Sequence, residues 1–308
     1  MDKKLLFYII KRLVLAVVTV YLVITITFFV MHNIPGGPFL SEKAPIPAVT
    51  AALEAKYGLD KPLGEQYLTY LKDAVHGDFG PSIKNRGRDV ADLIKEGFAV
   101  SAKIGGIAAV LAIVIGLILG SIAAVFHNKF IDKGIMVGST ACVAMPSFII
   151  ATFLLLIFCV LNQWLPANGS SAGGLILPVV SLSLYPMSYI TRLTRSSMLD
   201  VLGQDYIRTA RAKGVKSYKV IFKHSLRNAV TPVITYAGPM IAYILTGSLV
   251  VEKIFAVSGL GKYFVSSIIN RDYTMIMGTT IFLATLVVFM MLLSDILYKV
   301  FDPRVDFS

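Results

Sequence analysis

A strongly basic segment of this chain carries the side chains best suited to recognise a partner. Residues 204–232 read QDYIRTARAKGVKSYKVIFKHSLRNAVTP and hold seven basic residues against one acid, Asp205. The basic residues are Arg208, Arg211, Lys213, Lys216, Lys219, Lys223 and Arg227. Clustered positive charge attracts an acidic surface, which can belong to a protein or to anionic lipid. The segment therefore indicates electrostatic recognition and not bond-breaking chemistry.

The remaining reactive side chains form no catalytic motif. The histidines lie far apart and lack the H-E-x-x-H spacing of a metal site; they are His32, His76, His127 and His224. The stretch SGLGKYF has the GK pair of a phosphate-binding loop, but Tyr263 follows where Ser or Thr is required. The two cysteines, Cys142 and Cys159, fall in one predicted helix, about 25 Å apart. We expect no enzyme, no metal site and no cofactor in this chain.

Composition places the chain in the membrane class. Of its 308 residues, 56% are hydrophobic and 15% are charged, with a mean hydropathy of +0.74. A soluble domain carries about a quarter charged residues. The net charge of +11 is explained by membrane topology, as described below, so nucleic-acid binding is disfavoured.

Six apolar segments are long enough to cross a bilayer, which needs roughly 20 residues per helix. They lie at residues 13–31, 99–126, 134–161, 173–191, 228–251 and 273–298. The first is longer than the apolar core of a signal peptide, so we interpret it as a retained span. The sequence predicts an all-α integral membrane protein with six transmembrane helices.

The basic residues predict the orientation of these helices. They accumulate in residues 1–12, 192–227 and 299–308, whereas opposite charges nearly cancel in residues 32–98 and 252–272. Basic segments stay on the cytosolic side, so both termini are predicted to be cytosolic. Segment 32–98 is expected to form short amphipathic helices outside. Segment 252–272 is apolar enough to predict a re-entrant loop toward the pore.

Prolines and tyrosines inside the apolar segments suggest a translocation path. Prolines interrupt helices, and broken helices often line such paths. Alternatively, the prolines are ordinary kinks and the tyrosines are interfacial or core residues. The candidate path residues are Pro146, Pro186, Tyr189, Tyr236, Pro239 and Tyr243.

Periodicity predicts two short helices within the basic segment. Apolar residues from Leu199 to Ala210 follow helical spacing, and Gly214 is expected to end that helix. In the second helix, Lys219, Lys223 and Arg227 share one face, while Tyr218, Phe222 and Leu226 are expected to share a neighbouring one. Such a pair suits a protein partner, although an amphipathic hairpin on anionic lipid has the same pattern.

The segments ARAKG and HSLRNAVTPVIT resemble the EAA loop of ABC importer permeases, in the version of the dipeptide/oligopeptide (peptide/nickel) family. Ala210, Gly214 and Leu226 match the general pattern, while Arg208 replaces its leading Glu and Arg227 its final Pro. Further matches along the chain are IPGGPF, KYGLDKPLGEQYLTYL, GDFGPS, RLTRSSMLDVL, GSLVVEKIFAVSGLGKYFVSSIINRDY and DPRVDF. These stretches resemble permease subunits of oligopeptide systems.

The resemblance implies the type I importer permease fold in a bacterial cytoplasmic membrane. It also implies partners: a second permease, two cytosolic ATPase subunits that bind ATP and Mg²⁺, an external binding protein and a peptide substrate. The loop would dock on the ATPases and transmit their closure. By resemblance the coupling residues are Asp205, Tyr206, Arg208, Ala210, Lys213, Gly214, His224, Leu226 and Arg227.

Two other functions remain open. Close relatives in the same family carry nickel chelates, and an autonomous channel or secondary carrier would also explain six spans. A Gly214→Asp change separates the last case from the first two, because bulk and charge in the turn should uncouple a docked ATPase.

Overall fold

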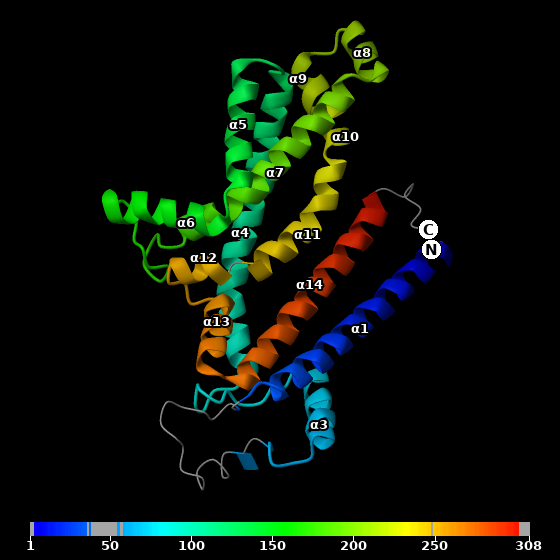
Figure 1. The fold of residues 1–308 in the computed structure, drawn as a ribbon. Helices are drawn as coiled ribbons and strands as arrows, with labels where there is room; N and C mark the ends of the chain where they lie inside the picture. The colour runs from blue at the N-terminus through cyan, green and yellow to red at the C-terminus, as the bar shows by residue number, and fades with distance from the viewer. Residues whose placement is uncertain (1–2, 36, 38–53, 56–57, 248, 302–308) are drawn as a thin grey trace. The chain divides into compact units, whose positions relative to one another are not determined.

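The computed structural model describes residues 3–35, 37, 54–55, 58–247 and 249–301. These residues form helices joined by short turns, with one isolated bridge between Pro81 and Asp89, which confirms the predicted all-α class for this part of the chain (Figure 1). The chain divides into two compact units. Unit 1 comprises Met1–Ser101 and Ser258–Leu292, and unit 2 comprises Ala102–Val257 and Leu293–Ser308.

Four helical stretches among the described residues are long and apolar enough to cross a membrane: Phe7–His32, Val90–Val125, Thr231–Ile254 and Tyr273–Ile296. A bent pair, Phe130–Ala144 with Ser147–Leu161, raises the number to five if it forms one span. Helix α7 (Ile176–Leu202) contains residues 176–191 of the remaining predicted span, 173–191. Its buried Ser and Thr residues lower its hydropathy, and six spans with cytosolic termini therefore stay a prediction.

Unit 1 packs α3 (Leu63–Val75) against α1 (Lys3–His32). Thr25 and Tyr67 share a 2.8 Å hydrogen bond between their hydroxyls, and the ring of Phe28 lies edge-on to Tyr67 and tilted against Tyr70. Helix α3 falls in the predicted external segment, of which residues 38–53 lie outside the described part. The turn before α3 contains Gly58 at φ +67°, and the sequence predicts that the short helices of this segment are broken at Gly58–Pro62.

A buried carboxylate fixes the loop that leads to α4 (Val90–Val125). Asp272 is 1% exposed and stands directly before α14 (Tyr273–Phe301). It accepts hydrogen bonds from two hydroxyls and three backbone amides, those of Ser82, Thr274, Ile83, Lys84 and Met275. Every donor is neutral, and the loop is thereby joined to the first turn of α14.

Unit 2 is built on a close contact between α4 and α7. A Cβ at Gly116 would lie 2.9 Å from the carbonyl oxygen of Met187, and one at Gly120 would lie 2.6 Å from that of Thr191. Glycines four residues apart share one face of a helix and let two backbones approach closely in a membrane. Any side chain at these positions would push the helices apart.

Helices α5 (Phe130–Ala144) and α6 (Ser147–Leu155) pack on α7. They meet at an angle of 104°, because Pro146 lacks the amide hydrogen that would continue the helix. Helix α6 runs on into a π-helical turn, η1 (Leu156–Leu161). By contrast, Pro186 and Pro239 lie inside α7 and α11 (Thr231–Gly247) without ending them.

The predicted re-entrant segment, 252–272, contains the end of α12 (Leu249–Ile254) and the whole of α13 (Leu260–Asn270). Its apolar residues serve packing inside each unit. Phe255 and Val257 are buried in unit 2, where the Phe255 carbonyl accepts a 2.8 Å hydrogen bond from Gly169. Leu260 is buried in unit 1, in a cluster with Val90 and Met275. Entry of this segment into a pore stays a prediction.

Candidate functional site

The basic segment begins where α7 ends. Gly203 and Gln204 separate α7 from α8 (Asp205–Ala212), so the single helix expected from Leu199 to Ala210 is in fact two. Asp205 occupies the first turn of α8, where a negative charge is favourable to the helix dipole. Figure 1 shows α8 and α9 (Ser217–Lys219) at the end of α7 that adjoins the turn between α4 and α5.

Gly214 ends α8, as the sequence indicates. It adopts the left-handed φ of +78°, and the amide of Val215 donates to the carbonyl of Ala210 at 3.2 Å. Glycine adopts this conformation without the steric cost that other residues meet. No atom lies within 4 Å of the place where a Cβ would stand. Within this chain the constraint on a side chain at Gly214 is therefore the backbone angle, and the predicted effect of bulk and charge on a docked ATPase stays a prediction.

The second helix of the segment contains a π-helical turn, η2 (Val220–Leu226), between α9 and α10 (Arg227–Ala229). Its fully buried residues are Val220, Ser225 and Ala229. The step of five from Val220 to Ser225 is the register that a π turn produces. Of the three side chains predicted to share a face beside the basic one, Tyr218 and Phe222 are exposed and Leu226 is half-buried.

Apolar contacts seat the segment on unit 2. Ile207 in α8 is fully buried. Ala229 belongs to a buried cluster with Ala124 of α4 and Met198 of α7, against which Ile221 and Leu226 pack. Asn228 also donates a 2.9 Å hydrogen bond to the Tyr206 hydroxyl, which joins the two halves of the segment. We call residues 204–229 the coupling segment.

The outer surface of the coupling segment combines positive charge with aromatic rings. Tyr206, Tyr218 and Phe222 are 45%, 55% and 64% exposed. Around them the exposed basic residues are Arg208, Arg211, Lys213, Lys216, Lys219, Lys223 and Arg227. Arg208 forms a 3.6 Å ion pair with Asp205, both largely in solvent, where such pairs add little to stability. His224 is half-buried, and its carbonyl accepts a hydrogen bond from Asn228.

Three of the candidate path residues line one cavity in unit 2. Pro146 contributes from the break between α5 and α6, Pro186 from α7 and Tyr243 from α11. Tyr185 joins them, and the cavity measures about 320 Å³. The sequence could not reveal this convergence, because the three elements are distant along the chain.

The other candidate path residues lie elsewhere. The rings of Tyr189 and Tyr236 contact each other in a tilted arrangement, with a centroid distance of 4.3 Å, which joins α7 to α11. Pro239 is exposed on α11 and does not line the cavity. Within the described residues, no group of three or more His, Cys, Asp or Glu side chains is arranged for a metal ion.

Two protein-family models match this chain. One is described as a binding-protein-dependent transport system inner membrane component and matches residues 116–307. The other describes the N-terminal part of such membrane components and matches residues 5–90. Both the coupling segment and the cavity fall inside the first match.

Curated relatives are similar over nearly their whole length. The chain is 48% identical over 299 residues to the dipeptide transport system permease protein DppB of Bacillus subtilis (strain 168), which covers 97% of both chains. It is 43% identical over 303 residues to the oligopeptide transport system permease protein OppB of Salmonella typhimurium (strain LT2), which covers 97% of this chain and 99% of the relative.

Solved structures share the fold at lower identity. A chain of the inward-facing MetNI methionine ABC transporter superimposes with a TM-score of 0.58 at 17% identity, covering 68% of this chain and 96% of that one. A chain of an amino acid ABC transporter with histidines gives a TM-score of 0.51 at 17% identity, covering 70% and 94%. Likeness at this identity concerns the fold alone.

Proposed function

Because this chain belongs to the family of binding-protein-dependent transport system inner membrane components, we propose that it is a permease subunit of an ATP-driven importer of dipeptides or oligopeptides. The peptide cargo is supported by relatives whose names specify dipeptide and oligopeptide transport and which match almost end to end. In this assembly the chain supplies half of the translocation path, and a second permease supplies the other half.

The topology in the proposal is six spans with both termini in the cytosol of a bacterium. The distribution of basic residues supports this orientation, and the described helices include four or five apolar spans. Helix α7 supplies the remaining span. Its Ser181, Ser188 and Thr191 are buried, so its polar side chains face protein and its position in a bilayer costs less than its hydropathy suggests.

The exposed surface of the coupling segment is the observation that carries the proposal. Three largely solvent-exposed aromatic rings, those of Tyr206, Tyr218 and Phe222, lie among basic side chains. Interfaces are enriched in aromatic and arginine side chains, and their anchors are of these types. We propose that this surface docks into a cleft of a cytosolic ATPase subunit, which binds ATP and Mg²⁺. An external binding protein delivers the peptide.

The cavity at Pro146, Pro186 and Tyr243 is the proposed part of the path. Tyrosine offers a flat apolar ring and one hydroxyl, which together suit backbone and varied side chains of a peptide. The break at Pro146 leaves backbone groups at this point without helical partners, as in helices that line transport paths. The path therefore accepts cargo without strong sequence preference.

The test is reconstitution of the whole importer in proteoliposomes: this chain, the second permease, the two ATPases and the binding protein. The variant Tyr218→Ala/Phe222→Ala should lose ATPase co-purification and ATP-dependent uptake of a labelled tripeptide. Phe153→Ala is the matched control, because Phe153 is a similarly exposed aromatic residue on α6. Normal ATPase binding and uptake by the double variant would contradict the docking role.

Two further arms of the same experiment address the other functions. Uptake of a nickel chelate without uptake of peptide would replace the proposed cargo. Uptake by vesicles that contain this chain alone, driven by an ion gradient, would replace the whole assembly with an autonomous carrier.

A further inference from the structure

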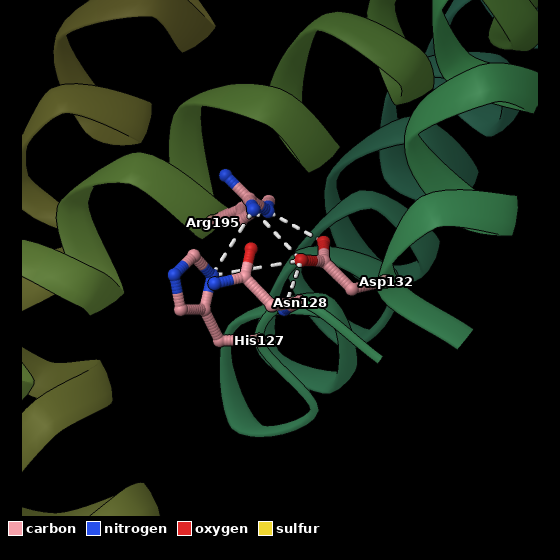
Figure 2. A network of polar contacts seen from close by, with 4 residues as sticks. All are labelled: His127, Asn128, Asp132 and Arg195. Carbon is pink, nitrogen blue, oxygen red and sulfur yellow. Dashed lines mark hydrogen bonds and ion pairs between the residues drawn. The ribbon is translucent and has the colours of Figure 1, made fainter. Parts of the chain in front are cut away.

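A second polar cluster lies next to the coupling segment, and the proposed function does not use it. It consists of His127, Asn128, Asp132 and Arg195 (Figure 2). Arg195 donates through Nε to Asp132 Oδ1 at 2.6 Å and through Nη2 to Oδ2 at 2.7 Å. The guanidinium and the carboxylate thus form a two-pronged pair, which fixes direction as well as distance. Nη2 also lies 3.2 Å from Nδ1 of His127.

The carboxylate of Asp132 is shared between two structural elements. Its side chain is 3% exposed and that of Arg195 is 22% exposed. Besides the guanidinium, Asp132 Oδ2 accepts a 2.9 Å hydrogen bond from the backbone amide of Asn128. Asn128 adopts a left-handed φ of +61° in the turn between α4 and α5. One carboxylate therefore holds the backbone of this turn and the side of α7 together.

Arg195 lies on α7 between the coupling segment and the part of the helix that lines the cavity. It lies one helical turn before Met198, which packs with Ala124 and Ala229 where the coupling segment is seated. Asp132 lies in the first turn of α5. The other end of α5 is the break at Pro146, which lines the cavity with Pro186 and Tyr243. The ion pair therefore stands between the coupling segment and the cavity, within unit 2.

The ion pair opposes sliding of α7 along α5, which apolar packing alone does not. Replacing a buried pair with well-packed apolar residues is often neutral or stabilising, so its presence is weak support for a role in stability. Apolar contacts between two helices permit small sliding displacements, as in shear motions. A two-pronged pair opposes such sliding, because displacement would break two charge-assisted hydrogen bonds in a nearly buried site.

We propose that Asp132 and Arg195 are positioning residues that make α5 move together with α7 when the coupling segment is displaced by its ATPase. This inference rests on the proposed function. The pair transmits the displacement to the Pro146 break and thus to the shape of the cavity. Without the pair, the ATPase still docks and hydrolyses ATP, but α7 slides along α5 and the cavity does not follow.

The experiment measures peptide taken up per ATP hydrolysed by the whole importer in proteoliposomes. Asp132→Asn keeps the shape of the side chain and removes its charge, and Arg195→Gln replaces the guanidinium with a shorter, neutral polar side chain. Each variant should lower the ratio roughly tenfold, within the usual range of coupling energies, while ATPase subunits stay bound and hydrolysis continues. Arg195→Lys should fall as well, because an ammonium group cannot form the two-pronged contact.

A double-mutant cycle distinguishes a joint from two separate effects. If the residues act as a pair, Asp132→Asn/Arg195→Gln should be no worse than either single variant. Arg192→Gln is the matched control for α7, because Arg192 is an exposed arginine three residues earlier. Lys133→Gln is the control for α5. Both controls should transport as the wild type does.

Three outcomes of these measurements would overturn the inference. Unchanged uptake per ATP in Arg195→Gln would exclude transmission through the pair, and multiplying effects in the double variant would exclude joint action. If Arg195→Gln and Arg195→Lys both fail to assemble with the ATPases, the pair is a folding element and not a joint. A wild-type importer that takes up no peptide would instead contradict the proposed function, so the two failures are separable.

Discussion

Two buried carboxylates, one in each unit, are satisfied in opposite ways. Asp272 in unit 1 is surrounded by neutral donors, and three of them are backbone amides. Asp132 in unit 2 receives one backbone amide and the guanidinium of Arg195. Both carboxylates are almost fully buried, so the difference is in the donors and not in the exposure.

The difference concerns what each carboxylate allows to move. Backbone amides have fixed positions, so Asp272 holds residues 82–84 and the start of α14 in a single arrangement. Arginine reaches its partner through several rotatable bonds and keeps a preorganised fork at the end. The pair of Asp132 and Arg195 therefore holds α5 to α7 while the two helices move together. The first carboxylate is suited to a static joint and the second to a moving one.

The largest expected effect comes from removing the static joint. Asp272→Ala leaves several buried donors without an acceptor, and such losses cost about 3–5 kcal/mol when they break a buried network. We expect this decrease in the free energy of unfolding, measured by titration from mild detergent into SDS micelles.

Asp78→Ala is the control for Asp272→Ala. Asp78 lies in the loop between α3 and α4, which also contains residues 82–84. It is exposed and accepts one hydrogen bond from the amide of Gly80. Its loss should cost no more than about 1 kcal/mol. Equal effects of the two substitutions would remove the distinction drawn for Asp272.

A second prediction tests the close backbone contact between α4 and α7, apart from the ion pair between α5 and α7. Gly120→Ala places a Cβ 2.6 Å from the Thr191 carbonyl oxygen, and overpacking of this kind costs about 1–3 kcal/mol. Gly106→Ala on the same helix meets no atom within 4 Å and should change the same titration little. If Gly120→Ala is equally harmless, the close approach at Gly120 does not position α7 against α4, and the comparison with the ion pair becomes sharper.

A third, smaller effect concerns the turn of the coupling segment. Gly214→Ala must adopt a left-handed angle, at a cost of about 1–2 kcal/mol, and should weaken ATPase co-purification. Asn tolerates this region better than Ala, so Gly214→Asn should retain more of the partner. Gly203→Ala, at an ordinary φ of −79°, is the control. An equal loss in all three variants would exclude backbone strain as the cause.

The smallest effect is expected for the exposed ion pair. Arg208 and Asp205 are 75% and 96% exposed, and Arg208→Ala should leave the free energy of unfolding unchanged in the SDS titration. Arg195→Ala in the same titration should be clearly destabilising, because it leaves Asp132 buried without its charge partner. An equal change in the free energy of unfolding for both arginine variants would mean that burial of the ion pair does not determine its contribution to stability.

Part of this architecture could be predicted because it depends on neighbouring residues. The helix end at Gly214 follows from glycine in a basic, otherwise helical segment, and the apolar helices follow from composition. The break at Pro146 follows from the missing amide hydrogen. The family membership followed from several motifs in the correct order.

Other features depend on contacts between distant residues. Arg195 and Asp132 are 63 positions apart, and Ser82 and Asp272 are 190 apart, so no local pattern indicates either pair. The π turn in η2 determines which residues of the second helix are buried, because the inward step from Val220 to Ser225 is five residues and not four. Periodicity assumes a constant register and could not show this.

The bend at Pro146 has a consequence for how the chain enters the membrane during synthesis. Helix α5 has 15 residues, which at about 1.5 Å per residue is shorter than a hydrocarbon core of roughly 30 Å. Neither half of the bent pair spans a bilayer by itself, so if the pair forms one span, the insertion machinery must accept α5 and the helix after Pro146 as one unit. In that case a reporter enzyme fused directly after Met145 would give an ambiguous location, whereas fusions in residues 162–172 would report a single side.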